Sequence, residues 1–137
     1  MARYYFDTSI WVDLYENRKG FCSEPLGDYA FKLLSIITAR GDSVIITDLL
    51  IRELEKNYSI PEIKGMFKLF EDITIKIMAT QEERKEAENV AVQRSVPLGD
   101  ALHAIIARDN NLILVTRDNH FRHLKDISEH YKPEELT

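Results

Sequence analysis

The sequence is poor in the residues that crosslink small proteins or divide them into segments. Among its 137 residues it has one cysteine, Cys22, which excludes an internal disulfide and a cysteine-based zinc site. A single cysteine fits the reducing cytoplasm, where we expect the protein to act. Its 5 glycines and 4 prolines are scattered, and no linker, repeat or low-complexity tract interrupts the chain. We therefore expect residues 1–137 to form one domain.

Long apolar runs and an excess of positive charge are also missing. The longest apolar runs, Ala104 to Ala107 and Leu112 to Val115, are four residues long, whereas a membrane span needs roughly 20. The N-terminus has no apolar core typical of a signal peptide, so no membrane association is expected. The 18 Lys and Arg face 23 Asp and Glu, which gives a net charge of −5. This balance excludes a broadly basic nucleic-acid-binding coat but not a local basic face.

The apolar pattern predicts strands that alternate with helices. Strands are expected where short apolar or alternating runs occur, at 4–6, 43–47, 73–78 and 112–115, with a brief fifth strand at 126–127. Helices are expected where apolar residues recur at helical spacing, at 10–15, 26–40, 48–57, 61–72, 80–94 and 98–106. This alternation predicts a three-layer α/β/α sandwich around a mainly parallel sheet of four to five strands.

Three aspartates stand where such a sheet places its functional site, beyond the carboxyl ends of the strands. Asp7 follows the first strand, Asp118 follows the fourth, and Asp100 opens the helix that leads into the fourth. Each has an ordinary structural explanation as well. Asp7 and Asp118 are good helix caps, and Asp100, in the first turn of its helix, interacts favourably with the helix dipole.

Glu53 is the acid that fits its local pattern least. On the helix from Asp48 it falls between Leu49 and Leu50, inside the apolar stripe. A carboxylate there costs several kcal/mol unless it is paired or bound to a metal, and a buried ion pair is the structural alternative. His103, one turn after Asp100, is interpreted as a surface or packing residue.

If these four acids converge at one edge of the sheet, their charges repel one another and one carboxyl stays protonated unless a cation binds. Oxygen ligands without cysteine or a histidine cluster favour Mg²⁺ or Mn²⁺ over Zn²⁺. The acids together therefore indicate a divalent metal site.

Four segments, in order, resemble the motifs of PIN domains. They are Phe6 to Trp11, Thr47 to Leu54, Val96 to Ala104 and Leu114 to Phe121. The resemblance spans about residues 5–127, and four motifs in register are far more specific than any one of them. It implies a metal-dependent ribonuclease fold with strand order 3-2-1-4-5.

The resemblance also implies roles for individual residues. The catalytic acids and the ligands of one or two Mg²⁺ or Mn²⁺ ions would be Asp7, Glu53, Asp100 and Asp118. Ser9 and Thr116 would support them through hydrogen bonds. The expected reaction is hydrolysis of RNA phosphodiesters to 5′-phosphate and 3′-hydroxyl ends. Many compact PIN proteins are VapC-type toxins that pair with an antitoxin protein, and others act in RNA processing.

Basic residues follow the fourth strand, near the expected site. Arg117, Arg122 and Lys125 are expected to contact RNA phosphates, and a solvated charged face is the alternative. Their position predicts a local basic surface despite the acidic net charge.

An interaction module with weak or no nuclease activity is the alternative function. The apolar residues of two helices would then form a homodimer interface or an antitoxin groove, although core packing also explains them. They are Ile10, Trp11, Leu14, Tyr15, Met66, Phe67 and Phe70. A phosphoacceptor signalling domain fits poorly, because the first strand ends in Asp7 alone and the third ends in Ile77, Met78 and Ala79.

Overall fold

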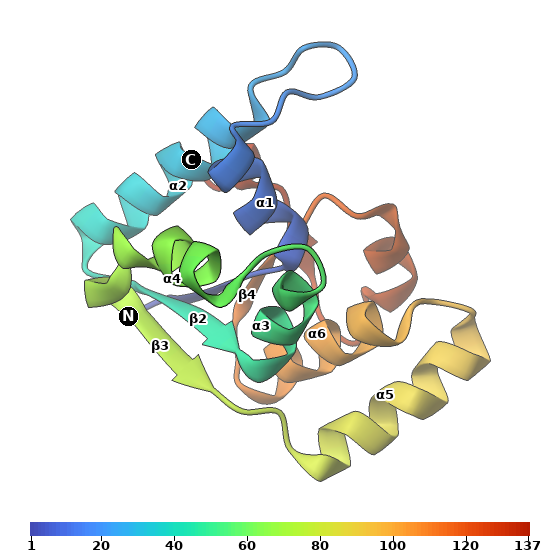
Figure 1. Ribbon diagram of the computed structural model, residues 1–137. Helices are drawn as coiled ribbons and strands as arrows, with labels where there is room; N and C mark the ends of the chain where they lie inside the picture. The colour runs from blue at the N-terminus through green and yellow to red at the C-terminus, as the bar shows by residue number, and fades with distance from the viewer.

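The computed structural model describes residues 1–137 and contains one parallel five-stranded sheet with helices on both faces (Figure 1). The strands are β1 (Arg3–Phe6), β2 (Ser43–Thr47), β3 (Thr74–Ile77), β4 (Ile113–Val115) and β5 (His130–Tyr131). Their order is β3-β2-β1-β4-β5, and every neighbouring pair is parallel. This confirms the predicted α/β fold, the order 3-2-1-4-5 and the edge position of the third strand.

Six helices connect the strands. They are α1 (Thr8–Glu16), α2 (Leu26–Arg40), α3 (Asp48–Glu55), α4 (Ile60–Lys68), α5 (Gln81–Arg94) and α6 (Leu98–Asp109). Three short 3₁₀ segments are η1 (Glu71–Ile73), η2 (Asn119–Leu124) and η3 (Pro133–Glu135). Capping boxes start α4 at Ser59 and α5 at Thr80, and Gly41, with φ 72°, ends α2. None of the helices is both long and apolar enough to cross a membrane.

The central strand β1 divides the core into two layers because its side chains alternate between the faces of the sheet. Tyr4 and Phe6 point into one layer, with Trp11 of α1 and Leu33 of α2. Tyr5 points into the other layer, which α5, α6 and η2 cover. In Figure 1, α1, α2 and α4 lie together on one side, and α5 extends away from the sheet on the other.

The predicted fifth strand at 126–127 is wrong, because β5 forms at His130–Tyr131 and pairs with Leu114 and Val115. Residues 126 and 127 instead complete the turn after η2. The backbone N–H of Ile127 donates to Leu124 O at 3.0 Å, and the Asp126 carboxylate binds Arg94 of α5. The helix predicted over 61–72 is also shorter: α4 ends at Lys68, and η1 follows separately.

Candidate active site

Asp7 lies at the carboxyl end of β1 and is 5% exposed. Its backbone N–H donates to Val115 O at 3.0 Å, which ties the ends of β1 and β4 together. Its carboxylate accepts hydrogen bonds from Ser9 Oγ at 2.7 Å, Thr116 Oγ1 at 2.5 Å and Ile10 N at 3.3 Å. Burial raises the pKa of Asp7, and the hydrogen bond from Thr116 opposes that rise. Asp7 is thus both the cap of α1 and a buried carboxylate at the sheet edge.

Asp100, Asp118 and His120 form a compact group at the same edge. His120 Nδ1 lies 3.2 Å from Asp100 Oδ2 and 3.0 Å from Asp118 Oδ1. One potential ligand atom from each of the three residues lies within 4.8 Å of the others. Burial and then the negative charge of Asp118 raise the pKa of Asp100 to about 6. His120 was not predicted as a site residue, although it lies within the fourth motif, Leu114 to Phe121.

Glu53 of α3 approaches the start of α6. Its Oε1 accepts a hydrogen bond from Thr8 Oγ1 at 2.5 Å and lies 2.7 Å from His103 Nε2. Burial opposes ionisation of Glu53, but the hydrogen bonds from His103 and Thr8 outweigh it and lower the pKa. A Cβ at Gly99 would overlap Glu53 Oε2, so the glycine allows the carboxylate to lie against the backbone at the start of α6.

His103 is a buried member of this network, so of its two predicted roles, a surface or a packing residue, the structure excludes the surface position. It is 1% exposed. Its Nδ1 lies 2.6 Å from Tyr5 Oη, which is in turn 2.8 Å from Thr47 Oγ1. Thr47 also accepts a hydrogen bond from Leu50 N as the cap of α3. A hydrogen-bonded chain therefore runs from the start of α3 through β1 and α6 to Glu53.

Thr116 links Asp7 to the Asp100 group. Its Oγ1 donates to Asp7 Oδ2 and accepts from Asp118 N at 3.0 Å. Thr8, which follows Asp7 in the chain, donates a hydrogen bond to Glu53 and so connects Asp7 with Glu53. Asp7, Glu53, Asp100 and Asp118 thus belong to one connected edge, although Asp7 and Glu53 are already engaged by hydrogen-bond donors.

The donor set fits a hard divalent cation. Carboxylate oxygens are the ligands that Mg²⁺ and Mn²⁺ prefer. Asp100 and Asp118 come close together while Asp100 is partly buried, and the resulting repulsion shows in the raised pKa of Asp100. A cation between these oxygens would relieve that repulsion.

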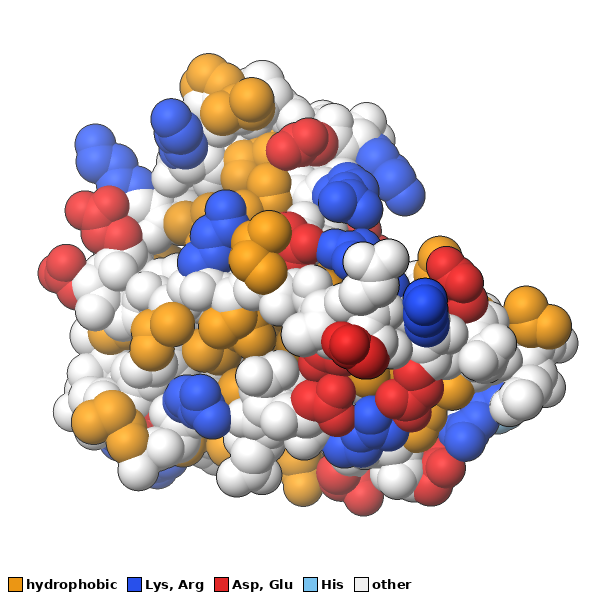
Figure 2. Space-filling view, turned by 90° about the horizontal axis from the view of Figure 1, so that it is seen from below, with side chains coloured by type: hydrophobic (Ala, Val, Ile, Leu, Met, Phe, Trp, Pro, Cys, Tyr) orange, Lys and Arg blue, Asp and Glu red, His pale blue; other side chains and the backbone are white.

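The three basic residues predicted to contact RNA phosphates have different surroundings: Arg117 is paired with carboxylates, whereas Arg122 and Lys125 are not. Arg117 donates two hydrogen bonds to Glu134, at 2.9 and 2.6 Å, and its Nε lies 3.6 Å from Asp13 Oδ2. Its guanidinium also lies over the Tyr29 ring at 5.7 Å. Arg122 and Lys125 are exposed and form no ion pair. Figure 2 shows both Lys and Arg side chains and acidic side chains on one face of the molecule.

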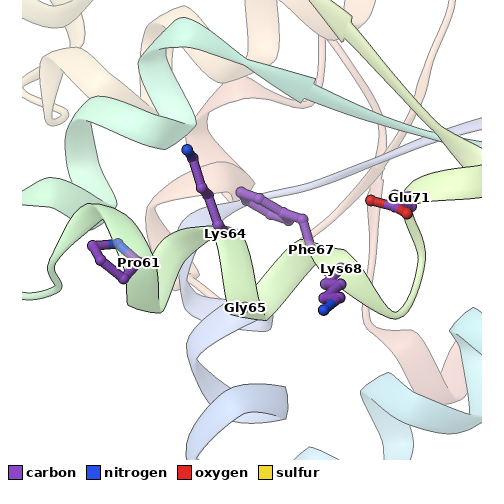
Figure 3. A pocket seen from close by; sticks show the side chains of 6 residues that line it. All are labelled: Pro61, Lys64, Gly65, Phe67, Lys68 and Glu71. Atoms are coloured by element: carbon purple, nitrogen blue, oxygen red, sulfur yellow. The ribbon is translucent and has the colours of Figure 1, made fainter.

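The largest hollow, about 660 Å³, lies on α4 and contains none of the four acids (Figure 3). It is lined by Pro61, Lys64, Gly65, Phe67, Lys68 and Glu71. A second, apolar hollow of about 240 Å³ lies between α1, α2 and α4. Neither overlaps the acidic edge.

The strand order and the acidic carboxyl edge together define a PIN-like α/β domain. The model of the PIN domain family matches residues 4–127, and the chain belongs to that family. No curated protein sequence matches the chain.

Solved structures with the same fold include two toxin–antitoxin assemblies. A toxin–antitoxin complex from Klebsiella pneumoniae is 18% identical, with TM-score 0.65, over 95% of this chain and 97% of that one. VapBC2 from Rickettsia felis, bound to a DNA fragment from its promoter, is 19% identical, with TM-score 0.65 and coverages of 95% and 96%. A protein of Pyrobaculum aerophilum is 19% identical, with TM-score 0.60 and coverages of 98% and 86%.

Proposed function

We propose that the protein is a metal-dependent endoribonuclease that hydrolyses RNA phosphodiester bonds. PIN domains are typically metal-dependent nucleases. The observation that carries the proposal is the group formed by Asp100, Asp118 and His120, at the edge that also holds Asp7 and Glu53. Burial and then the negative charge of Asp118 raise the pKa of Asp100 to about 6, and a cation between the two carboxylates would offset their repulsion.

The four acids divide into two kinds in this proposal. Asp100 and Asp118 hold one or two Mg²⁺ or Mn²⁺ ions, and Asp7 and Glu53 complete the ligand set directly or through water. When bound, the ion would lower the pKa of a water molecule and neutralise charge on the leaving oxygen. Ser9 and Thr116 fix Asp7 through the hydrogen bonds described above. Such supporting contacts orient ligands and tune their affinity for metal.

RNA would approach the acidic edge along η2. Arg122 and Lys125 project from this segment without acidic partners, so their charges are available to phosphates. Arg117 would reach RNA only by releasing Glu134 and Asp13.

We propose an antitoxin protein as a partner, since solved neighbours are toxin–antitoxin complexes. The apolar hollow is the proposed docking groove, and Tyr15, Phe31 and Leu69 on its wall are exposed. The buried Trp11 also lines it and has an indole N–H without an acceptor. An amphipathic helix suits such a groove.

Three of the other apolar residues predicted for an interface, Ile10, Met66 and Phe70, are buried and pack in the core. A cytoplasmic homodimer is part of the same proposal.

The decisive assay is cleavage of a mixed-sequence single-stranded RNA with Mg²⁺ or Mn²⁺. Wild type should cut it, and Asp118→Asn should lose the activity without unfolding. Asp72→Asn is the matched control, because Asp72 is exposed and its carboxylate has no hydrogen-bond partner. Equal cleavage by wild type and Asp118→Asn would overturn the proposal. A metal-binding protein that leaves RNA intact would instead support the interaction-module alternative.

A further inference from the structure

A small polar hollow adjoins the acidic edge on its outer side. It measures about 170 Å³ and has no hydrophobic residue in its lining. The end of β4, the segment η2 and the β5–η3 segment form its walls. Thr116 and Asp118 belong to both the acidic edge and this hollow, so a ligand in it would lie next to the proposed metal site.

Three cations without acidic partners face this hollow. Arg122, Lys125 and Lys132 line it, are exposed and form no ion pair. Elsewhere in the molecule, arginines such as Arg94 and Arg108 are paired with carboxylates. With Arg117, four cations line the hollow against two carboxylates, Asp118 and Glu135, so the hollow is locally positive in a protein of net charge −5 and attracts anions.

Two buried nitrogen atoms of lining residues lack hydrogen-bond partners. They are His130 Nδ1 and Arg117 Nε. Arg117 Nε faces Asp13 Oδ2 at 3.6 Å. Buried polar atoms in folded proteins almost always have partners, so an acceptor supplied by a ligand would complete His130 Nδ1. Burial, followed by the positive charge of Lys125, lowers the pKa of His130, which favours the neutral form of its ring. A neutral ring is able to carry its proton on Nδ1 and donate it to an anionic oxygen.

We propose that this hollow is a phosphate-binding subsite, in which Arg122, Lys125, Lys132 and His130 hold one phosphate of bound RNA beside the acidic cluster. The inference rests on the proposed nuclease function and adds two residues of the β5–η3 segment, His130 and Lys132, to the RNA contacts. An internal phosphodiester and a terminal phosphate present the same kind of oxygen acceptors. The same cations and the same His130 N–H would bind either one, and the test separates them.

The test is an NMR titration of metal-free protein that follows the His130 ring and the backbone amide of Lys132. The probes are inorganic phosphate and two short mixed-sequence RNAs, one with a 5′-hydroxyl and one with a 5′-phosphate. We expect all three to shift the His130 signals. Equal affinity for the two RNAs would identify an internal phosphodiester as the ligand, and tighter binding of the 5′-phosphate form would identify a terminal phosphate.

Lys132→Gln and Arg122→Gln should each weaken binding of the RNAs several-fold and reduce the slope of log affinity against log salt by about 0.7 per lost contact. Lys85→Gln is the matched control, because Lys85 is an exposed lysine on α5 outside the hollow. The inference is overturned if the His130 signals do not shift, or if Lys85→Gln weakens binding as much as Lys132→Gln. Unchanged melting temperatures would show that the variants are folded.

A melt with Mn²⁺ separates failure of this inference from failure of the proposed function. If Mn²⁺ raises the melting temperature but phosphate does not shift the His130 signals, the phosphate subsite is contradicted and the metal site is supported. If phosphate shifts the His130 signals but Mn²⁺ does not raise the melting temperature, the nuclease proposal is contradicted and the hollow is an anion-binding site only.

Discussion

His103 Nε2 lies 2.7 Å from Glu53 Oε1, so a buried histidine of α6 holds the carboxylate that α3 brings to the acidic edge. The other ring nitrogen contacts Tyr5 Oη, and this contact fixes the orientation of the imidazole. The position of Glu53 is therefore determined by residues from three separate elements. A carboxylate on an apolar helix stripe is tolerated here because it is paired.

Replacing His103 by Phe keeps an aromatic ring, somewhat larger than imidazole, but removes both hydrogen bonds. Because the hydrogen bond from His103 helps to lower the pKa of Glu53, that pKa should rise in metal-free protein. Stability should fall by about 1–3 kcal/mol, since Tyr5 Oη and Glu53 each lose a partner. Carboxyl ¹³C titration and urea unfolding measure the two effects. An unchanged Glu53 titration would show that His103 does not hold the carboxylate.

Gly99→Ala should damage the site more than the fold. The added Cβ would overlap Glu53 Oε2, so the carboxylate must shift from its position between Thr8 and His103. We expect RNA cleavage to fall at least about tenfold, as is common when a supporting contact of a metal ligand is lost. Gly65→Ala in α4 is the matched control, because its Cβ would meet no atom within 4 Å. Similar cleavage rates for the two variants would contradict the account.

Asp100 makes the metal-free protein less stable as pH rises. Its folded pKa of about 6 lies above the ordinary value of 3.8, so the folded state binds the proton more tightly than the unfolded state. The contribution of this proton is fully present below pH 3.8 and is lost as pH rises to about 6. Asp100→Asn should remove this component from urea-unfolding free energies measured across the interval. A pH profile identical to that of wild type would contradict the raised pKa.

Leu69→Glu tests the proposed docking groove. Leu69 is 74% exposed at the wall of the apolar hollow, so a charge there should leave the fold intact. It should prevent a co-expressed antitoxin from remaining bound through size-exclusion chromatography with light scattering. Val92→Glu on α5 is the control, since Val92 is 82% exposed and lies outside the hollow. If the Leu69→Glu protein still retains the antitoxin, the apolar hollow is not its docking site.

Most of the fold could be predicted because the strands and helices carry clear apolar periodicity. The run Ser43–Thr47, for example, is β2 itself. The strand β5 escaped prediction because it has only two residues, His130 and Tyr131, and neither gives an apolar pattern. Its place is set by pairing with β4, a contact that local sequence does not encode.

The acids were also visible in the sequence, whereas the contacts around them were not. The sequence allows Asp7 and Asp118 to be either helix caps or site residues, and the structure shows that both act as caps at the edge of the sheet. The burial of His103 depends on Tyr5 and Glu53, which are distant in the chain. The engagement of Arg117 by Glu134 likewise arises only when the C-terminal segment folds back. Tertiary partners of this kind leave no local signal.

The central claim, a divalent metal site at the acidic edge, is tested most directly by thermal melts of metal-free protein with and without Mn²⁺. A cation that binds only the folded state must stabilise it, by about 2.7 kcal/mol at 100 times its Kd. We predict a clear rise in melting temperature for wild type and none for Asp118→Asn, with Asp72→Asn behaving as wild type. No rise for wild type at millimolar Mn²⁺, or an equal rise for Asp118→Asn, would contradict the account.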